Sequence, residues 1–247
     1  DLWDAAYLGD GKAGYVHTIA KEIERDGKKL IHSTVVLRLT VNRFGDRVEM
    51  AADTGTVETT EGKVAGVFMK QFLAGKQQLV IEGTVKGDVV NLTLNGNTPL
   101  KPAIWNSEVL GIYTQETIFK HRELKPETSF TFLSFEPIIN KVLKTQVSVK
   151  GEREVILKGS KTKKKLLLVE VIPEKIEFRR EGDKVETIQL PIRQMWLDAK
   201  FDQVKSEFEV PGLGPIVTYR TTKADALAPG PPAQLVDLGF NQLIRLK

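Results

Sequence analysis

The three histidines are the first residues to consider for proton transfer or metal binding. His17 and His32 flank a predicted two-residue hairpin loop at 26–27. In that register His17 lies opposite Val36, and His32 lies opposite Lys21. The two rings then share a face of the sheet but are roughly 13–14 Å apart, at about 3.4 Å per residue. That separation is too large for one metal ion or one proton relay.

Other catalytic patterns are missing from the sequence. The chain has no cysteine, which removes thiolate nucleophiles, disulfides and cysteine-bound metals. It has no Gly-x-Ser-x-Gly elbow, no glycine-rich phosphate loop and no calcium-loop pattern. His121 falls in the last turn of a predicted helix, where the helix dipole favours a surface cation. The 32 acidic residues form no pair with an apolar cage. We therefore predict no catalytic residue, no cofactor and no metal site, and so no enzyme.

Ligand binding remains open as an alternative to catalysis. Aromatic side chains with a polar group combine a large contact area with hydrogen bonding. On that ground the candidate binding residues are Tyr15, His17, Trp105, Tyr113 and Trp196. For each of them, ordinary packing in the core or at a sheet edge is the competing interpretation.

The composition is that of an ordinary globular protein. The 247 residues carry 36 Lys and Arg against 32 Asp and Glu, a net charge of +4, and 41% are hydrophobic. No apolar run approaches the ~18 residues that would span a membrane. The one dense basic run, at 161–165, has no interleaved aromatic residues, so it predicts an exposed hairpin tip. A nucleic-acid surface would instead need a basic stripe with stacking aromatics.

Turn signals recur along the chain and predict a mainly β (α+β) protein. The pairs at 87–88 and 95–96 supply the positive φ angles that tight hairpins require, and the segment 89–94 between them alternates apolar and polar residues. We expect a large curved antiparallel sheet, or half-barrel, made of two β-rich halves at about 1–100 and 126–220. Two separate small sheets are the alternative.

One segment between the two halves breaks this pattern. Its apolar residues follow helical spacing, and Asn106 or Ser107 can cap its start. We therefore predict one main helix near 107–124. A second, shorter helix is expected after Thr222, because Thr222 and Asp225 resemble a capping box with Asp in place of Glu.

These elements predict one β-rich curved-sheet domain at 1–228, with the helical connection at 106–124. Residues 229–247 are interpreted as a Pro-rich linker and the start of a following segment. The linker at 229–232 is stiff because it contains three prolines, and the apolar segment after it ends abruptly. This favours a chain that continues into another domain.

Short segments of the sequence resemble a known family. The opening WDAAYLG at 3–9 is followed by KAGYVH at 12–17, and MWLDA at 195–199 precedes YRTTKADAL at 219–227. These segments resemble the non-catalytic β-rich N-terminal region of exported planctomycete-type transglutaminase-like proteins. The WLDA strand is also similar to curved-sheet periplasmic proteins of the lipoprotein-carrier type.

The resemblance implies a non-enzymatic, extracytoplasmic accessory or binding module, periplasmic or secreted. It would lie N-terminal to a transglutaminase-like catalytic domain outside this chain. That domain uses a Cys-His-Asp triad, and no residue here inherits a role in it. The implied partners are the downstream domain and a peptide, glycan or apolar ligand, with no nucleic acid and no transmembrane segment. The alternative is a stand-alone periplasmic carrier of a lipid, lipoprotein or other apolar ligand, which requires an empty apolar cavity. A cleft with two facing carboxylates would instead favour an enzyme.

Overall fold

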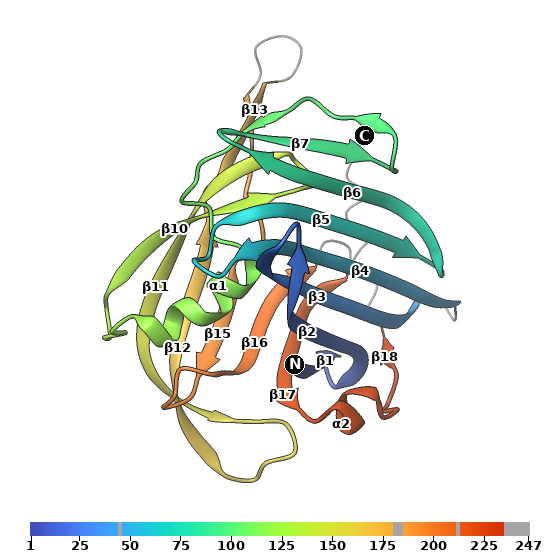
Figure 1. The fold of residues 1–247 in the computed structure, drawn as a ribbon. Helices are drawn as coiled ribbons and strands as arrows, with labels where there is room; N and C mark the ends of the chain where they lie inside the picture. Colours follow the sequence, from blue (N-terminus) through green and yellow to red (C-terminus); the bar gives the residue numbers. More distant parts are fainter. Residues whose placement is uncertain (44–45, 180–184, 211–212, 235–247) are drawn as a thin grey trace.

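The computed structural model describes residues 1–43, 46–179, 185–210 and 213–234, and one large sheet dominates it (Figure 1). A separate hairpin, β13 (Ile176–Arg179) with β14 (Val185–Ile188), projects beyond that sheet. The helical elements are α1 (Ile112–Thr117), the 3-10 turn η1 (Ile118–His121) and α2 (Lys223–Leu227). In chain order, the strands of the large sheet are β1 (Leu2–Leu8), β2 (Gly11–Arg25), β3 (Lys28–Arg43), β4 (Asp46–Thr59), β5 (Val64–Leu73), β6 (Lys76–Lys86), β7 (Val89–Leu94), β8 (Thr98–Pro99), β9 (Ala103–Ile104), β10 (Ser129–Glu136), β11 (Lys141–Ile156), β12 (Lys163–Pro173), β15 (Arg193–Leu197), β16 (Gln203–Val210), β17 (Gly214–Thr221) and β18 (Ala233–Gln234).

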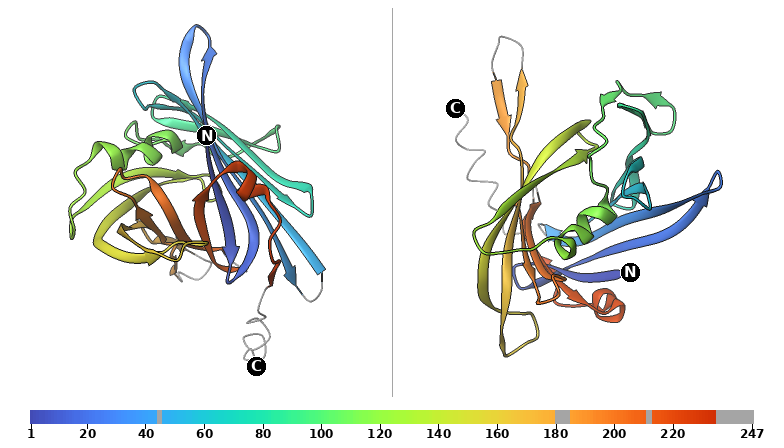
Figure 2. Two further views of the ribbon diagram at one scale, coloured as in Figure 1. Left: turned by 90° about the horizontal axis from the view of Figure 1, so that it is seen from below. Right: turned by 60° about the vertical axis from the view of Figure 1, so that its left-hand side comes forward.

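The order of these strands joins the two halves of the chain in the middle of the sheet. Hydrogen bonds link them as β10-β11-β12-β15-β16-β17-β1-β2-β3-β4-β5-β6-β7-β8, with β9 on β7 and β18 parallel to β3. The sheet bends so that the wall around β3 and β4 faces the wall around β15 and β16, and α1 lies between the walls (Figure 2). The predicted mainly β half-barrel is therefore confirmed, with both halves of the chain in one large sheet.

The β2–β3 hairpin shows how a tight turn sets the register of two long strands. Its loop residues Asp26 and Gly27 both have positive φ, at 53° and 70°. A two-residue loop with two positive φ angles fits the right-handed twist of the paired strands. His17 consequently lies opposite Val36, as the sequence predicted.

Three apolar clusters form along the concave face. In the first, Trp105 packs against Phe135 of β10, with ring centroids 5.4 Å apart, and this cluster also takes in side chains of β5, β6 and β7. The two edge regions of the half-barrel thus meet through side-chain packing. The second cluster includes Phe119 of η1 and Val169 of β12, and the third includes Ile216 of β17.

The connecting segment contains a shorter helix than the predicted 107–124, because α1 and η1 cover only its middle. Val109 is 2% exposed and forms a β-bridge with Leu133, so its burial takes the backbone before α1 out of the helical region. Asn106 accepts a hydrogen bond from the N–H of Glu108, which caps a local turn and not the helix.

The start of α1 is anchored by Glu58 of β4, a residue distant in sequence. This fully buried carboxylate accepts hydrogen bonds from the N–H groups of Tyr113 (2.9 Å) and Thr114 (3.2 Å). It also accepts from the hydroxyls of Thr114 and Thr56, both at 2.7 Å. A Cβ atom on Gly111 would lie 2.1 Å from the Glu58 Cδ, so the N-cap position requires glycine.

The second helix begins where the sequence predicts it. The Thr222 hydroxyl accepts a hydrogen bond from the N–H of Asp225 at 3.1 Å and donates one to its carboxylate at 2.8 Å. These bonds satisfy part of the free N-terminus of α2. Within the described ranges, no helix is long and apolar enough to cross a membrane.

The proline-containing segment after α2 runs back along the sheet. Lys12 donates its backbone N–H to the carbonyl of Pro231 at 2.7 Å, and Ala233 is fully buried beside Val41 of β3. Residues 229–234 therefore pack on the domain, and the remainder of the expected following segment, 235–247, lies outside the described residues.

Candidate ligand-binding cavity

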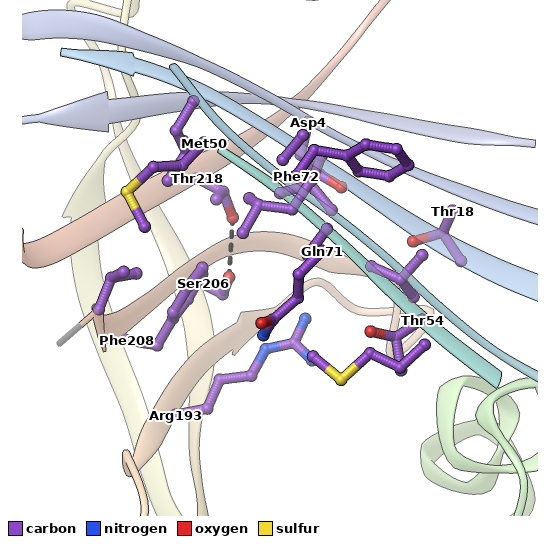
Figure 3. Close-up of a pocket in the computed structure, with 18 of the residues that line it drawn as sticks. Asp4, Thr18, Met50, Thr54, Gln71, Phe72, Arg193, Ser206, Phe208 and Thr218 are labelled. Carbon is purple, nitrogen blue, oxygen red and sulfur yellow. Dashed lines mark hydrogen bonds between the residues drawn. The ribbon is translucent and has the colours of Figure 1, made fainter. Parts of the chain in front are cut away.

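The concave face of the half-barrel encloses a cavity of about 720 Å³ (Figure 3). Much of its wall is apolar, with Leu37 and Leu39 of β3, Met50 of β4 and Phe208 of β16 among the lining residues. On β3 the lining residues occur at alternate positions, whose side chains share one face of a sheet. The same four residues also pack on the third apolar cluster, which makes that end of the cavity continuous with the core.

Short side chains leave this space unfilled. Ala52 and Thr54 of β4 and Thr18 of β2 line the cavity at positions where larger residues would occupy it. On the opposite wall the hydroxyls of Ser206 and Thr218 are hydrogen-bonded to each other at 2.7 Å (Figure 3). Packed interiors rarely leave such a volume, whereas ligand sites commonly measure about 300–1,000 Å³.

The charged groups of the lining come from β1, α1, β15 and β17. Arg220 of β17 donates from Nε to Asp4 of β1 at 2.9 Å, and Asp4 is 3% exposed. Arg193 of β15 donates from Nη2 to the side-chain oxygen of Gln203 at 2.5 Å. Glu116 of α1 lines the same space. The lining residues contributed by β3 and β4 are uncharged.

Exposed apolar residues border the opening of the cavity. Leu73, at the end of β5, is 48% exposed, and Ile138, in the turn between β10 and β11, is 56% exposed. Both residues line the cavity. The cavity therefore reaches solvent between the β5–β6 turn and the β10–β11 turn, and its apolar lining continues to the surface there.

Glu136, beside this opening, makes stability depend on pH. Burial raises the pKa of Glu136 above its ordinary value of 4.5, although the N–H of Ile138 donates to the carboxylate at 3.3 Å. A carboxyl whose pKa rises on folding destabilises the native state once the pH exceeds its unfolded pKa. We therefore expect Glu136→Gln to raise the free energy of unfolding at pH 7 and to leave it unchanged at pH 3, in urea titrations. An equal gain at both pH values would contradict this assignment.

Two further hollows flank the main cavity. One of about 210 Å³ lies beside α1 and shares Thr18, Glu116 and Gln203 with the main cavity. It is also lined by Ser33, whose buried hydroxyl has no hydrogen-bond partner among the described residues. The other, of about 400 Å³, is bordered by Tyr15 and shares part of its lining with the main cavity.

Two of the predicted binding residues, Tyr15 and His17, lie on the outer face of β2, because the alternate residues of that strand line the cavity. The ring of His17 stacks on the ring of Trp3, with centroids 3.6 Å apart. The ring centroid of Tyr15 lies 5.5 Å from that of Trp3. His17 Nε2 is 2.5 Å from a carboxylate oxygen of Asp1. Burial, and then the positive charges of the N-terminal amine and two lysines, nevertheless lower the pKa of His17.

The other three predicted residues lie at separate places. Trp105 is buried in the first apolar cluster. Trp196 is 7% exposed with the Lys205 ammonium 3.8 Å from its ring centroid, and burial lowers the pKa of Lys205. Tyr113 lines the smaller hollow beside α1. The structure does not bring the five residues together, none of them lines the main cavity, and their role in binding stays a prediction.

Sequence reasoning did not single out the residues that do line the main cavity. The available signal was the run of small residues at 51–55 within a strand, where large β-branched residues are more usual. No local sequence pattern identifies Arg193 or Phe208 as cavity residues. Their place in the lining depends on the opposite wall, which β4 and β5 form on the other side of the cavity.

The lining contains few ionisable groups. Its two carboxylates are Asp4, which is held by Arg220, and Glu116. In the part of the chain that the structure describes, no group of three His, Asp or Glu residues could hold a metal ion. The cavity offers apolar contact area and a few hydrogen-bonding groups, which are the elements of a small-molecule site.

Comparison with known proteins defines the class of fold. No protein-family model matches the chain, and no curated protein matches it. It is similar to the crystal structure of a β-barrel-like protein of the domain of unknown function DUF1849 from Brucella abortus. The TM-score is 0.59 at 10% sequence identity, over 90% of this chain and 94% of that chain. The chain therefore has a β-barrel-like fold.

Proposed function

We propose that this chain is a non-enzymatic binding module that takes an apolar ligand into the half-barrel. The observation that carries the proposal is the cavity of about 720 Å³, with a mostly apolar wall and an apolar opening. An apolar molecule gains roughly 25 cal/mol for each Å² of surface that it removes from water there. A scaffold protein would gain more by filling the same space with side chains.

We further propose that the module works outside the cytoplasm, beside a transglutaminase-like domain. The resemblance of segments 3–9 and 195–199 to the N-terminal region of exported transglutaminase-like proteins supports this placement. The gene tests it: an upstream signal peptide and a downstream Cys-His-Asp core are expected in the same reading frame. A stop codon directly after Lys247 would contradict the arrangement and favour a stand-alone carrier, which the cavity equally supports.

Blocking the cavity tests the binding function directly. Ala52 lies between Leu37 and Gln71 in the sheet register and faces the cavity, so Ala52→Trp places an indole in the binding space. We expect the variant to bind the neutral apolar fluorophore N-phenyl-1-naphthylamine at least about tenfold more weakly, a loss of about 1.4 kcal/mol. Fluorescence titration measures the dissociation constant.

The matched control is Glu82→Trp, which adds the same side chain at an exposed position of β6 outside the three hollows. It is expected to bind the fluorophore like the unmodified protein. Failure of the unmodified protein to bind, or unchanged binding by Ala52→Trp, would refute the proposed function. Mass spectrometry of an organic extract of the purified protein should also detect a co-purified apolar molecule.

A further inference from the structure

The two arginines of the cavity differ in their partners. Arg220 is neutralised by the buried carboxylate of Asp4, at 2.9 Å. Arg193 is bonded instead to Gln203, whose amide carries no charge. Within the described ranges, Arg193 makes no ion pair with a carboxylate. A charge partly removed from water without a counter-ion is costly unless a partner of opposite charge joins it.

The guanidinium of Arg193 also has unused hydrogen-bonding capacity. Its Nε–H is buried and has no hydrogen-bond partner among the described residues. A guanidinium presents five N–H donors in a planar fork that matches carboxylate and phosphate oxygens. Gln203 is itself 7% exposed and lies at a register shift between β15 and β16. Its hydrogen bond with Arg193 therefore fixes the direction of the guanidinium group. The Nε–H of Arg193 is thus a positioned donor without an acceptor among the described residues.

A second donor approaches Arg193 from the opposite wall. Figure 3 shows the side chains of Gln71, on β5, and Arg193, on β15, pointing toward one another across the cavity. Strands β5 and β15 are far apart in the sheet order, so only the bending of the sheet brings these groups close. An anion between them would accept from the guanidinium and from the amide nitrogen of Gln71. Phe208, the register neighbour of Arg193 on β16, begins the apolar surface next to it.

We propose that Arg193 binds the head group of an anionic amphiphile, a molecule with an apolar chain that ends in a carboxylate or a phosphate. This inference rests on the proposed function, because the chain of the ligand would occupy the apolar part of the same cavity. The head group lies at Arg193 and Gln71, and the chain runs along Phe208, Met50 and Leu37. The ion pair of Asp4 with Arg220 adds no net charge to this arrangement.

Glu116 is the other charged group of the lining, and it opposes an anion. It lies on α1 and also borders the smaller hollow, and it forms no ion pair with Arg193 within the described chain. Removing its charge should therefore leave anion binding intact or strengthen it. Glu116→Gln is accordingly a matched control, since it also converts one charged residue of the cavity into glutamine.

The test compares ligands that share a twelve-carbon chain and differ in the head group. Dodecanoate, dodecyl phosphate and dodecanol each displace N-phenyl-1-naphthylamine from the unmodified protein, from Arg193→Gln and from Glu116→Gln. The measured quantity is the ratio of the dodecanol dissociation constant to that of each anion. We expect Arg193→Gln to lower this ratio by about ten- to a hundredfold, the range of a charge-assisted hydrogen bond. Glu116→Gln should keep or raise it, and the two anions distinguish a carboxylate head group from a phosphate.

The outcomes separate this inference from the proposed function. If Arg193→Gln still binds the neutral fluorophore and dodecanol but loses the preference for the anion, the head-group site is supported. If the ratio is unchanged in Arg193→Gln, Arg193 is not the head-group site, although the cavity still binds apolar ligands. If neither the fluorophore nor dodecanol binds the unmodified protein, the proposed function fails, and the inference fails with it.

Discussion

Replacing Glu58 with alanine is expected to lower the free energy of unfolding by about 3–5 kcal/mol. The carboxylate accepts four hydrogen bonds, two of them from N–H groups at the start of α1, and it is fully buried. Alanine leaves those donors without acceptors and creates a space beneath the helix. For a chain of this size each kcal/mol corresponds to roughly 2–4 °C in Tm. A decrease on the order of 10 °C should therefore appear in thermal unfolding followed by circular dichroism.

Two further variants show that the loss comes from the anchor of α1. Glu24→Ala removes an exposed carboxylate of β2 and should leave Tm within error of the unmodified protein. Glu58→Gln keeps one acceptor oxygen but turns an NH₂ group toward the helix donors, so an intermediate Tm is expected. A Tm for Glu58→Ala equal to that for Glu24→Ala would show that η1 and its apolar contacts hold the segment without the carboxylate.

The dependence of α1 on Glu58 explains why its boundaries were predicted poorly. Sequence spacing identified a helical segment, and Asn106 or Ser107 was the nearest residue able to cap it. The observed cap comes instead from β4, at a separation of 55 residues from Tyr113. A one-dimensional pattern carries no information about such a contact, because it depends on how β4 passes beneath the connecting segment.

Local features of the sheet were more predictable because short-range geometry determines them. The positive φ angles of Asp26 and Gly27 fix the register of the β2–β3 hairpin, and the alternation of Val90 and Leu92 marks the buried face of β7. Thr222 caps α2 through a residue three positions away. Each of these three features depends on residues close together in the chain, so the sequence pattern alone is enough to predict it.

The cavity was less predictable because it arises from the curvature of the whole sheet. A curved sheet was predicted, but the identity of the residues that line its cavity depends on which strands face one another across the bend. Arg193 and Gln71 point toward one another only because β15 and β5 lie on opposite walls. The aromatic residues chosen for their chemistry, such as Trp105, serve in packing or lie outside the main cavity. Large aromatic area is as useful to a core as to a site.

Replacing Arg220 with methionine is expected to lower the free energy of unfolding by about 3–5 kcal/mol. The substitution leaves the Asp4 carboxylate without its cationic partner, and only 4% of that side chain is exposed to water. Removing one member of a buried ion pair is costly because the remaining charge has lost both water and its counter-ion. Asp4→Asn should cost less, because the Arg220 side chain is 22% exposed and can still donate to the amide oxygen.

The double variant Asp4→Asn/Arg220→Met separates the unpaired charge from a packing defect. It contains no buried charge at this position, so it is expected to recover part of the stability that Arg220→Met loses. Urea titrations of the four proteins complete a double-mutant cycle and give the interaction energy of the pair. If adding Asp4→Asn to Arg220→Met does not raise the free energy of unfolding, the stability lost in Arg220→Met comes from the packing of the arginine side-chain stem. In that case the wall of the cavity depends on the shape of Arg220 and not on its charge.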